Sequence, residues 1–359
     1  MLRFCLHKHS FVRLCRIAPQ KRSCGHVPTA QEPSYVYASP TKEHSISVRD
    51  GRRVAVTEWG VDDDSSFPVF YFHGTPLCRL EPLLHGGDVE DPYTAARVRL
   101  VSIDRPGFGR SDPQPPASRA LMEGARDVLD VADNLGIAKF GVLGFSAGSP
   151  YALACAAHPD FACRLVAVAV MCSPAESGAP DFKAPLRSKL EGLFLRNCPE
   201  TLLSLMARLG VSVYLTTCEA FPKIAARLLM LSEPASVQTT VCTPHFGHTT
   251  STVIKEAVVQ GIDGALADTL LTQSPAKPWG FSLRHISPDL PVQVFHGQHD
   301  AVVPVEAARW LQQQIPHCTV AYVNGGHGLP FYYMKHVLTN MTRGGWQTQR
   351  ATTSKIEVQ

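Results

Sequence analysis

Short apolar runs alternate along most of the chain with longer segments of helical pattern. The runs have the length of buried strands and are bounded by turn residues or charges. They predict strands at residues 44–48, 53–59, 69–72, 97–103, 140–144, 164–172, 293–295 and 319–323. Helices are predicted at residues 118–134, 147–157, 305–315 and 330–340. This alternation predicts an α/β fold with a mostly parallel eight-stranded sheet that is flanked by helices on both faces.

The alternation stops between the sixth predicted strand and the seventh. This stretch is mostly helical in pattern and is interrupted by Pro222, Pro234 and Pro244. We interpret residues 176–287 as a helical cap inserted after strand 6, with residues 41–175 and 288–341 forming the core. The polar residues 342–359 are expected to be a flexible tail.

The positive charge of the chain belongs to its first residues. Residues 1–31 contain six Lys or Arg and no Asp or Glu, whereas the whole chain has 34 basic and 31 acidic residues. The remainder is therefore slightly acidic, and the basic balance is no evidence for nucleic-acid binding. Residues 1–40 form a basic leader with interleaved apolar residues, which predicts a mitochondrial presequence; the alternative is a disordered extension of a cytoplasmic protein.

Other features of the composition favour an intracellular protein. The 11 cysteines are odd in number and scattered, which predicts free thiols in a reducing compartment. No uninterrupted apolar run approaches the ~20 residues of a membrane-spanning helix, so no transmembrane segment is expected. We find no phosphate-binding glycine loop, metal motif or nucleic-acid module.

Candidate chemistry begins at Gly144-Phe145-Ser146-Ala147-Gly148. This pentapeptide follows the predicted strand 140–144 and opens the predicted helix 147–157. A G-x-S-x-G sequence between a strand and a helix is typical of a nucleophile elbow, in which a sharp turn exposes the serine hydroxyl. The glycines allow the strand and the helix to pass closely.

Three further polar segments follow predicted strands. They read His73-Gly74-Thr75-Pro76, then His296-Gly297-Gln298-His299-Asp300, then Gly326-His327. Each lies just beyond the carboxyl end of a strand, where open α/β sheets place their ligand sites. The chain order is serine, acid, histidine.

Together with the segment Asp104-Arg105-Pro106-Gly107-Phe108-Gly109-Arg110-Ser111, these motifs resemble the cap-bearing branch of the α/β-hydrolase superfamily. The resemblance covers about residues 44 to 340. It implies a serine hydrolase that uses no cofactor or metal and acts on a small-molecule acyl substrate.

Roles can be assigned by chemistry. Ser146 needs a base and a group that orients the base. We assign His327 as the base, with His317 and His336 as competitors, and Asp300 as the acid, with Asp289 and Glu176 as competitors. The N–H groups of Thr75 and Ala147 are predicted to form the oxyanion hole. Gly74 and Phe145 are predicted to contact the substrate, whereas His73 is expected to brace its loop.

The serine at position 146 points to acyl transfer, because relatives that open epoxides or haloalkanes carry an aspartate there. The bond that is cleaved could belong to an ester, a thioester or an amide, or be an activated carbon–carbon bond. The residues Thr75-Pro76-Leu77 differ from the pattern of aminopeptidase relatives, so an esterase is favoured, and the apolar cap predicts an apolar acyl group. The alternatives are a non-catalytic binding protein, an aminopeptidase, and a haloperoxidase-like activity.

Overall fold

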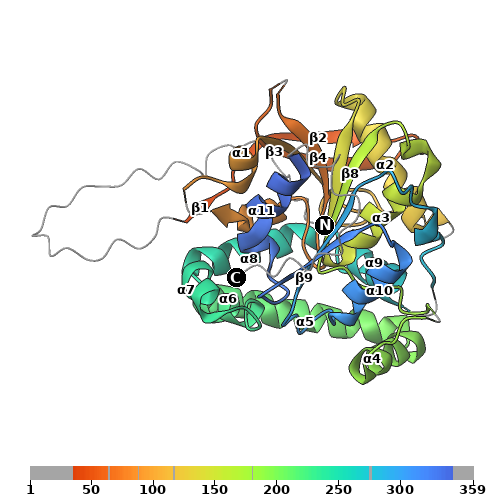
Figure 1. The fold of residues 1–359 in the computed structure, drawn as a ribbon. Helices are drawn as coiled ribbons and strands as arrows, with labels where there is room; N and C mark the ends of the chain where they lie inside the picture. The colour runs from red at the N-terminus through yellow and green to blue at the C-terminus, as the bar shows by residue number, and fades with distance from the viewer. Residues whose placement is uncertain are drawn as a thin grey trace, which may run out of the picture. The chain divides into compact units, whose positions relative to one another are not determined.

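A computed structural model describes residues 35–342 except 64, 88, 116, 117, 180, 275 and 276. Its centre is an eight-stranded sheet with the order β10-β9-β8-β7-β4-β6-β3-β2. Strand β3 pairs antiparallel with β2 and β6, and every other pairing in this sheet is parallel. The strands are β2 Pro40–Ser47, β3 Arg53–Gly60, β4 Phe67–Phe72, β6 Val98–Ile103, β7 Phe140–Phe145, β8 Leu165–Met171, β9 Val292–Gly297 and β10 Thr319–Val323 (Figure 1).

All eight predicted strands are therefore confirmed, and their ends shift by at most a few residues. The predicted core helices correspond to α2 Leu121–Asn134, α3 Ser149–Ala157, α10 Glu306–Gln314 and α11 Pro330–Thr342. Helix α2 begins later than predicted. The preceding Arg119 donates hydrogen bonds to the carbonyls of Pro106 and Gly264, at 3.3 and 3.1 Å, which holds that segment outside the helix.

Some short elements were not predicted. Strands β1 Val36–Tyr37 and β5 Gly86–Gly87 form a separate antiparallel pair, followed by α1 Pro92–Ala96. Regular structure thus begins inside the range 1–40 that was predicted to be a leader. Residues 1–34 of that leader, and residues 343–359 of the predicted tail, lie outside the described residues.

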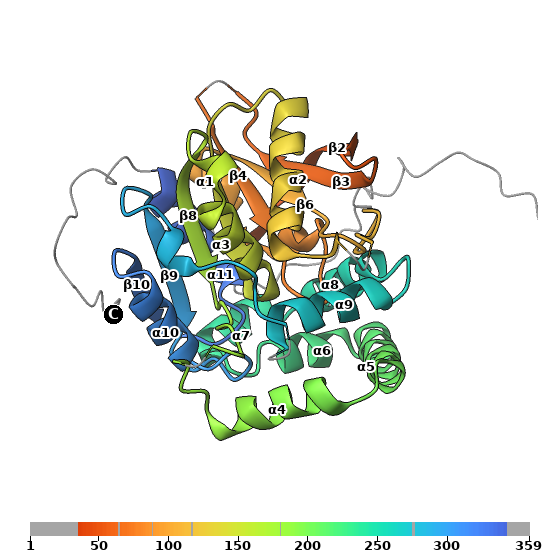
Figure 2. The ribbon, with the colours of Figure 1, turned by 90° about the vertical axis from the view of Figure 1, so that its right-hand side faces the viewer.

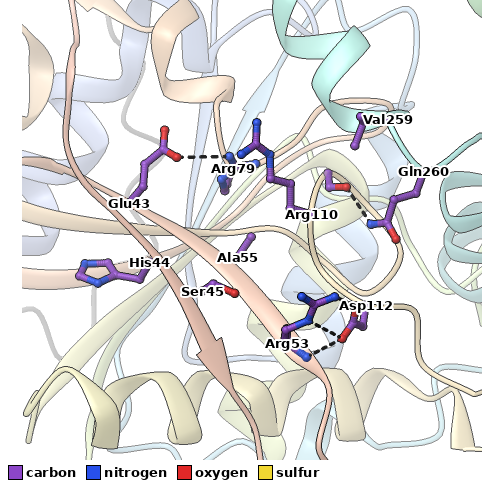
Figure 3. A pocket seen from close by; sticks show the side chains of 11 residues that line it. Glu43, His44, Ser45, Arg53, Ala55, Arg79, Arg110, Asp112, Val259 and Gln260 are labelled. Atoms are coloured by element: carbon purple, nitrogen blue, oxygen red, sulfur yellow. Dashed lines mark hydrogen bonds and ion pairs between the residues drawn. The ribbon is translucent and has the colours of Figure 1, made fainter. Parts of the chain in front are cut away.

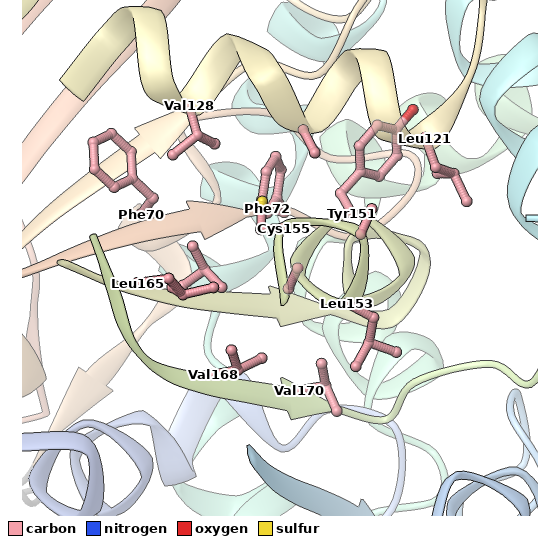
Figure 4. Packing of buried hydrophobic residues seen from close by; sticks show 14 of the residues in the cluster. Phe70, Phe72, Leu121, Val128, Tyr151, Leu153, Cys155, Leu165, Val168 and Val170 are labelled. Atoms are coloured by element: carbon pink, nitrogen blue, oxygen red, sulfur yellow. The ribbon is translucent and has the colours of Figure 1, made fainter. Parts of the chain in front are cut away.

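The central strands of the sheet are buried on both faces. Alternate residues of β4 point to opposite sides: Phe70 and Phe72 pack toward α2 and α3, while Val69 and Tyr71 pack on the other face. Figure 4 shows the first layer, where Val128 of α2 and Tyr151 of α3 close over the strands. Burial on both faces explains why the strands read as continuous apolar runs rather than alternating ones.

The segment predicted to be a cap lies between β8 and β9. Its described residues form α4 Leu186–Asn197, α5 Glu200–Ala220, α6 Pro222–Leu229, α7 Ala235–Val241, α8 Pro244–Ala257 and α9 Asp263–Gln273. The prolines that interrupt the pattern mark helix starts: Pro222 and Pro244 are first helical residues and Pro234 is an N-cap. Figure 2 shows these helices as a layer along one side of the sheet.

Helix α5 differs from the expectation that no segment could span a membrane. By length and composition alone its 21 residues are apolar enough to cross one, which is weak evidence by itself. The sequence pattern missed it because Ser204, Arg208 and Ser212 interrupt its apolar runs without making the helix polar overall.

Candidate active site

The turn after β7 holds Ser146 in a strained backbone conformation. Its φ of 50° lies in the left-handed region, which residues other than glycine rarely adopt. A Cβ at Gly144 would lie 2.6 Å from Cα of Ser149, and one at Gly148 would lie 2.2 Å from the carbonyl oxygen of Phe72. Only glycine fits at either position, so the G-x-S-x-G spacing is required by the close approach of α3 to the strands.

The structure brings Ser146, His327 and Asp300 together in one hydrogen-bonded chain. The hydroxyl Oγ of Ser146 lies 3.0 Å from Nε2 of His327, and Nδ1 of His327 lies 2.8 Å from Oδ2 of Asp300. The other carboxylate oxygen of Asp300 accepts hydrogen bonds from the N–H groups of Val302 and Val303, both at 2.8 Å. This arrangement fixes the imidazole with its proton on Nδ1 and its acceptor lone pair toward the serine.

The competing acid Glu176 is used elsewhere. It accepts a hydrogen bond from the N–H of Trp279 at 2.8 Å. Asp300 instead has a side chain with no exposed surface. Burial alone would raise its pKa, but His327, His296 and the Val303 N–H together hold the pKa of the Asp300 carboxyl below its ordinary value. It is therefore a carboxylate at neutral pH.

Two other histidines of the motifs support the site from behind. His296 is buried, and its Nε2 donates to the carbonyl of Val303 at 3.0 Å, which holds the loop that carries Asp300. His73 is also buried and accepts a hydrogen bond from the N–H of Arg105 at 3.1 Å. Burial and the nearby Arg105 lower the pKa of His73 well below its usual range, so this ring is neutral and braces its loop.

The two predicted oxyanion donors lie in loops that Arg105 holds. The Thr75 N–H has no acceptor within the described part of the chain, while its hydroxyl accepts from Nη2 of Arg105 at 2.7 Å. Nη1 of the same guanidinium donates to the carbonyl of Ala147 at 3.2 Å. Arg105 thus ties the loop after β4 to the elbow.

Gly74 and Phe145, predicted to contact the substrate, pack against each other beside the hydrogen-bonded triad of Ser146, His327 and Asp300. The Gly74 N–H donates to the buried Glu81 carboxylate at 2.8 Å. A Cβ at Gly74 would lie 2.8 Å from the Phe145 ring, whose centroid is 5.1 Å from that of His327. These contacts position the loop that carries Ser146 against the loop that carries His327.

Asp104 and Arg105 are adjacent in the sequence but bind different partners. Asp104 pairs with Arg79 at 2.9 Å on the core side. Arg105 pairs with Asp268 of cap helix α9, which also accepts a hydrogen bond from the Tyr151 hydroxyl at 2.8 Å. A cap carboxylate therefore anchors the residue that joins the loop after β4 to the elbow.

A second cap carboxylate, Glu233, binds the loop that carries His327, which we call the histidine loop. No motif predicted this carboxylate. Its Oε1 accepts from the Gly328 N–H at 2.6 Å, and its Oε2 accepts from the Gly326 N–H at 2.7 Å and from the Tyr332 hydroxyl at 2.6 Å. The side chain is buried and binds the residues on both sides of His327. The only signal in the sequence is a lone glutamate between Ser232 and Pro234, where the apolar helical pattern breaks.

Replacing Glu233 with alanine is expected to lower kcat by about 10- to 100-fold with little change in KM, since a displacement of ~1 Å in a catalytic group costs that much. It also leaves two buried N–H groups unsatisfied, at about 1–3 kcal/mol each in stability. Glu233→Gln, which keeps an acceptor oxygen, should recover part of kcat. Steady-state kinetics and thermal unfolding check this. The control is Glu219→Ala, which changes an exposed glutamate of the cap. If both variants had equal effects, Glu233 would not be a positioning residue.

The Sγ of Cys172 lies close to the triad. Its ligand atom and those of Asp300 and His327 all fall within 4.8 Å of one another, a spacing that metal ligands also show. Both nitrogens of His327 are already engaged, with Ser146 and Asp300, and burial raises the pKa of the Cys172 thiol well above its usual range. We therefore interpret this thiol as buried packing beside the triad.

A separate hollow lies at the edge of the sheet (Figure 3), and each arginine in its lining is paired with a carboxylate. It has a volume of about 550 Å³ and is lined by residues that include Arg53, Arg79 and Arg110. Arg53 pairs with Asp112, Arg110 pairs with Glu256, and Arg79 pairs with Asp104, Glu256 and Glu43. The lining includes none of the triad residues, so this hollow is distinct from the candidate active site.

The sheet order, the serine turn after β7 and the helices inserted after β8 define the alpha/beta hydrolase class. A family model for the alpha/beta hydrolase fold matches residues 68–332, and the chain belongs to this family.

Solved structures with the same fold include enzymes of different activities. The chain is similar to a thermophilic esterase from Thermogutta terrifontis, with 20% identity, a TM-score of 0.52, and coverage of 84% of this chain and 97% of that one. It is similar to a naproxen esterase from Bacillus subtilis, with 18% identity, a TM-score of 0.54, and coverage of 86% and 92%. A bromoperoxidase from Bacillus anthracis matches with 18% identity, a TM-score of 0.53, and coverage of 84% and 96%. At these identities the likeness establishes the fold, and the activity must be argued from the site.

Proposed function

We propose that this protein is a serine hydrolase that cleaves small or medium acyl esters or thioesters through an acyl-enzyme on Ser146. One observation carries the proposal: the Ser146 hydroxyl, held out by a strained turn, is hydrogen bonded to His327, which is bonded in turn to the Asp300 carboxylate. A hydroxyl is a weak nucleophile unless a base of this kind takes its proton.

The reaction follows from these positions. His327 accepts the hydroxyl proton through Nε2 while Ser146 Oγ attacks the acyl carbon, and the carbonyl becomes an oxyanion. The N–H groups of Thr75 and Ala147 stabilise that charge. His327 then gives its proton to the departing alcohol or thiol, and Asp300 stabilises the transient imidazolium. Water, activated by the same histidine, releases the acid and restores the hydroxyl.

Apolar cap residues favour an apolar acyl group. Met230 of the cap is fully buried. It lies beside the loop that carries His327, since a Cβ at Gly328 would lie 2.6 Å from the Met230 sulfur. Phe246 and Val253 of α8 belong to the same buried apolar cluster. Each methylene of an acyl chain that moves from water into such surroundings contributes about 0.8 kcal/mol of favourable transfer free energy.

A panel of p-nitrophenyl esters from acetyl to decanoyl tests this proposal. We expect kcat/KM to rise by about tenfold or more from acetyl to hexanoyl, because the added methylenes leave water. A parallel series of acyl thioesters separates the two substrate classes. A flat response to acyl length would rule out an apolar acyl site, and no hydrolysis of any ester by the folded protein would contradict the proposed activity.

A haloperoxidase-like activity is the second candidate, and the similarity to a bromoperoxidase is the observation that favours it. Bromination of monochlorodimedone, assayed with hydrogen peroxide, bromide and acetate, distinguishes the two. Bromination at a rate exceeding ester hydrolysis would favour this candidate over the hydrolase.

A further inference from the structure

The outer surface of the cap exposes far more apolar side chains than the rest of the molecule. Among the described residues, 17 large apolar side chains are exposed, and all but Val89, Val259 and Val302 lie between residues 186 and 231. Scattered single apolar residues are normal on a protein surface, whereas a concentration of this kind marks an interaction site. The set comprises Leu186, Leu190, Leu193, Phe194, Leu202, Leu205, Met206, Leu209, Val213, Phe221, Ile224, Leu228, Leu229 and Leu231, which we call the cap apolar surface.

All of these residues except Phe221 and Leu231 lie on three consecutive helices, α4, α5 and α6. On α5 the exposed positions Leu202, Leu205, Leu209 and Val213 recur every three or four residues and so share one face. The other face of α5 is also apolar and packs into the cap, with Leu203 and Cys218 buried and Val211 and Leu215 partly buried. A helix that is apolar on both faces and exposes one of them to solvent lacks a partner for the exposed face.

Basic residues are interspersed along the segment that carries this surface. Residues 183–231 contain seven Lys or Arg against three Glu, in a chain that is otherwise acidic beyond its first 31 residues. Five of the seven form no ion pair with any residue that the structure describes: Lys183, Lys189, Arg196, Lys223 and Arg227. All five are exposed. Exposed apolar stripes flanked by unpaired cations are the combination that binds an anionic lipid surface.

We propose that helices α4, α5 and α6 dock the protein on the surface of an anionic lipid bilayer, with the cap apolar surface in the interface and the flanking cations on the lipid headgroups. Docking in the plane of the interface fits the contacts of α5 better than spanning does. Its inner face is held in the cap, where the Tyr214 hydroxyl donates to the Ala225 carbonyl at 3.3 Å and Arg208 pairs with Asp263 at 3.1 Å. A spanning α5 would break these contacts and strip the packing of α6 and α8.

A second copy of the chain is a poorer occupant. In a symmetric dimer the same surface meets itself, so its unpaired cations would face cations. The surface is also dominated by leucine and other aliphatic residues. Protein interfaces are enriched in aromatic residues, methionine and arginine, and Phe194, Met206 and Phe221 are the members of the cap apolar surface that belong to those types. An anionic bilayer matches both the charge and the aliphatic character.

Flotation of the full chain with unilamellar vesicles tests the proposal. We expect binding to vesicles of phosphatidylcholine with 30% phosphatidylserine, and at least about tenfold weaker binding to phosphatidylcholine alone. The double variant Leu205→Glu/Leu209→Glu should weaken binding to the anionic vesicles by about tenfold or more, whereas Val259→Glu, the same change at an exposed cap position outside the surface, should not. Lys223→Gln/Arg227→Gln should weaken binding and flatten its salt dependence.

Other outcomes are decisive against the proposal. Equal binding of the wild type and the double variant would assign vesicle binding to another part of the chain. A salt-resistant fraction that only detergent extracts would indicate a spanning α5. A dimer in analytical ultracentrifugation that the double variant converts to a monomer, without vesicle binding, would identify a second copy as the partner. Flotation needs no catalytic turnover, so these results are independent of the proposed hydrolase activity.

Discussion

Replacing Ser146 with alanine is expected to lower kcat for ester hydrolysis by about a millionfold, to the residual rate that the oxyanion donors and binding alone supply. The reason is that the whole reaction passes through a bond to Oγ, which no neighbouring hydroxyl can replace. KM and thermal stability should change little, because the side chain is small and the turn is formed by the glycines. The substitution adds no backbone strain, because alanine and serine are equally disfavoured at the φ of 50° that this position adopts.

The matched control is Ser149→Ala, three residues further along at the start of α3. Ser149 is buried like Ser146, but its hydroxyl donates to the Gly144 carbonyl at 3.1 Å and does not face His327. This control should keep kcat within a few-fold of wild type while losing some stability. Ester cleavage by Ser146→Ala at even a hundredth of the wild-type rate would mean that another residue carries the chemistry.

The second largest effect is expected for Asp300→Asn, with a loss of about 10³ to 10⁴ in kcat. The amide keeps the volume of the carboxylate but has only one acceptor oxygen and no charge. It cannot both hold the Val302 and Val303 N–H groups and fix the Nδ1 proton of His327, nor stabilise the imidazolium. Glu176→Gln tests the competing acid and should leave kcat unchanged; the reverse pattern would transfer the acid role to Glu176.

The pH dependence of Asp300→Asn follows from the lowered pKa of the native carboxyl. Because the folded-state pKa of Asp300 lies below its ordinary value of 3.8, its ionisation stabilises the fold above the unfolded pKa, and this stability is lost as the pH falls through the folded pKa. The wild type should therefore be more stable than the variant at pH 7, and the difference should shrink below about pH 4. Urea unfolding of both proteins from pH 3 to pH 7 measures it.

The fold was predictable because its signals are local. Each central strand is a short apolar run such as 140–144, buried on both faces, and the strand ends carry polar residues that only a site requires. The elbow was predictable for a similar reason, since Gly144 and Gly148 are forced by contacts within a few ångströms of the serine. The eight strands and the position of Ser146 at the end of β7 follow from these patterns.

The supporting residues were not predictable because their partners are distant in the sequence. Glu233 reaches the residues beside His327, which are more than 90 positions away, and Asp268 reaches Arg105, which is 163 positions away. Neither carboxylate belongs to a motif, and either could be a solvated surface residue by pattern alone. Helix α5 was missed as a strongly apolar helix because its polar residues are spaced rather than grouped.

The central claim is that Ser146 is an activated nucleophile, and covalent labelling with a fluorophosphonate tests it most directly. The purified chain is treated with the probe, digested, and analysed by mass spectrometry. The hydrogen-bonded chain of Ser146, His327 and Asp300 predicts one adduct per molecule on the peptide that contains Ser146, with labelling lost in Ser146→Ala and strongly slowed in His327→Ala. A folded wild-type protein that takes no label on Ser146, or that is labelled as fast without His327, would contradict it.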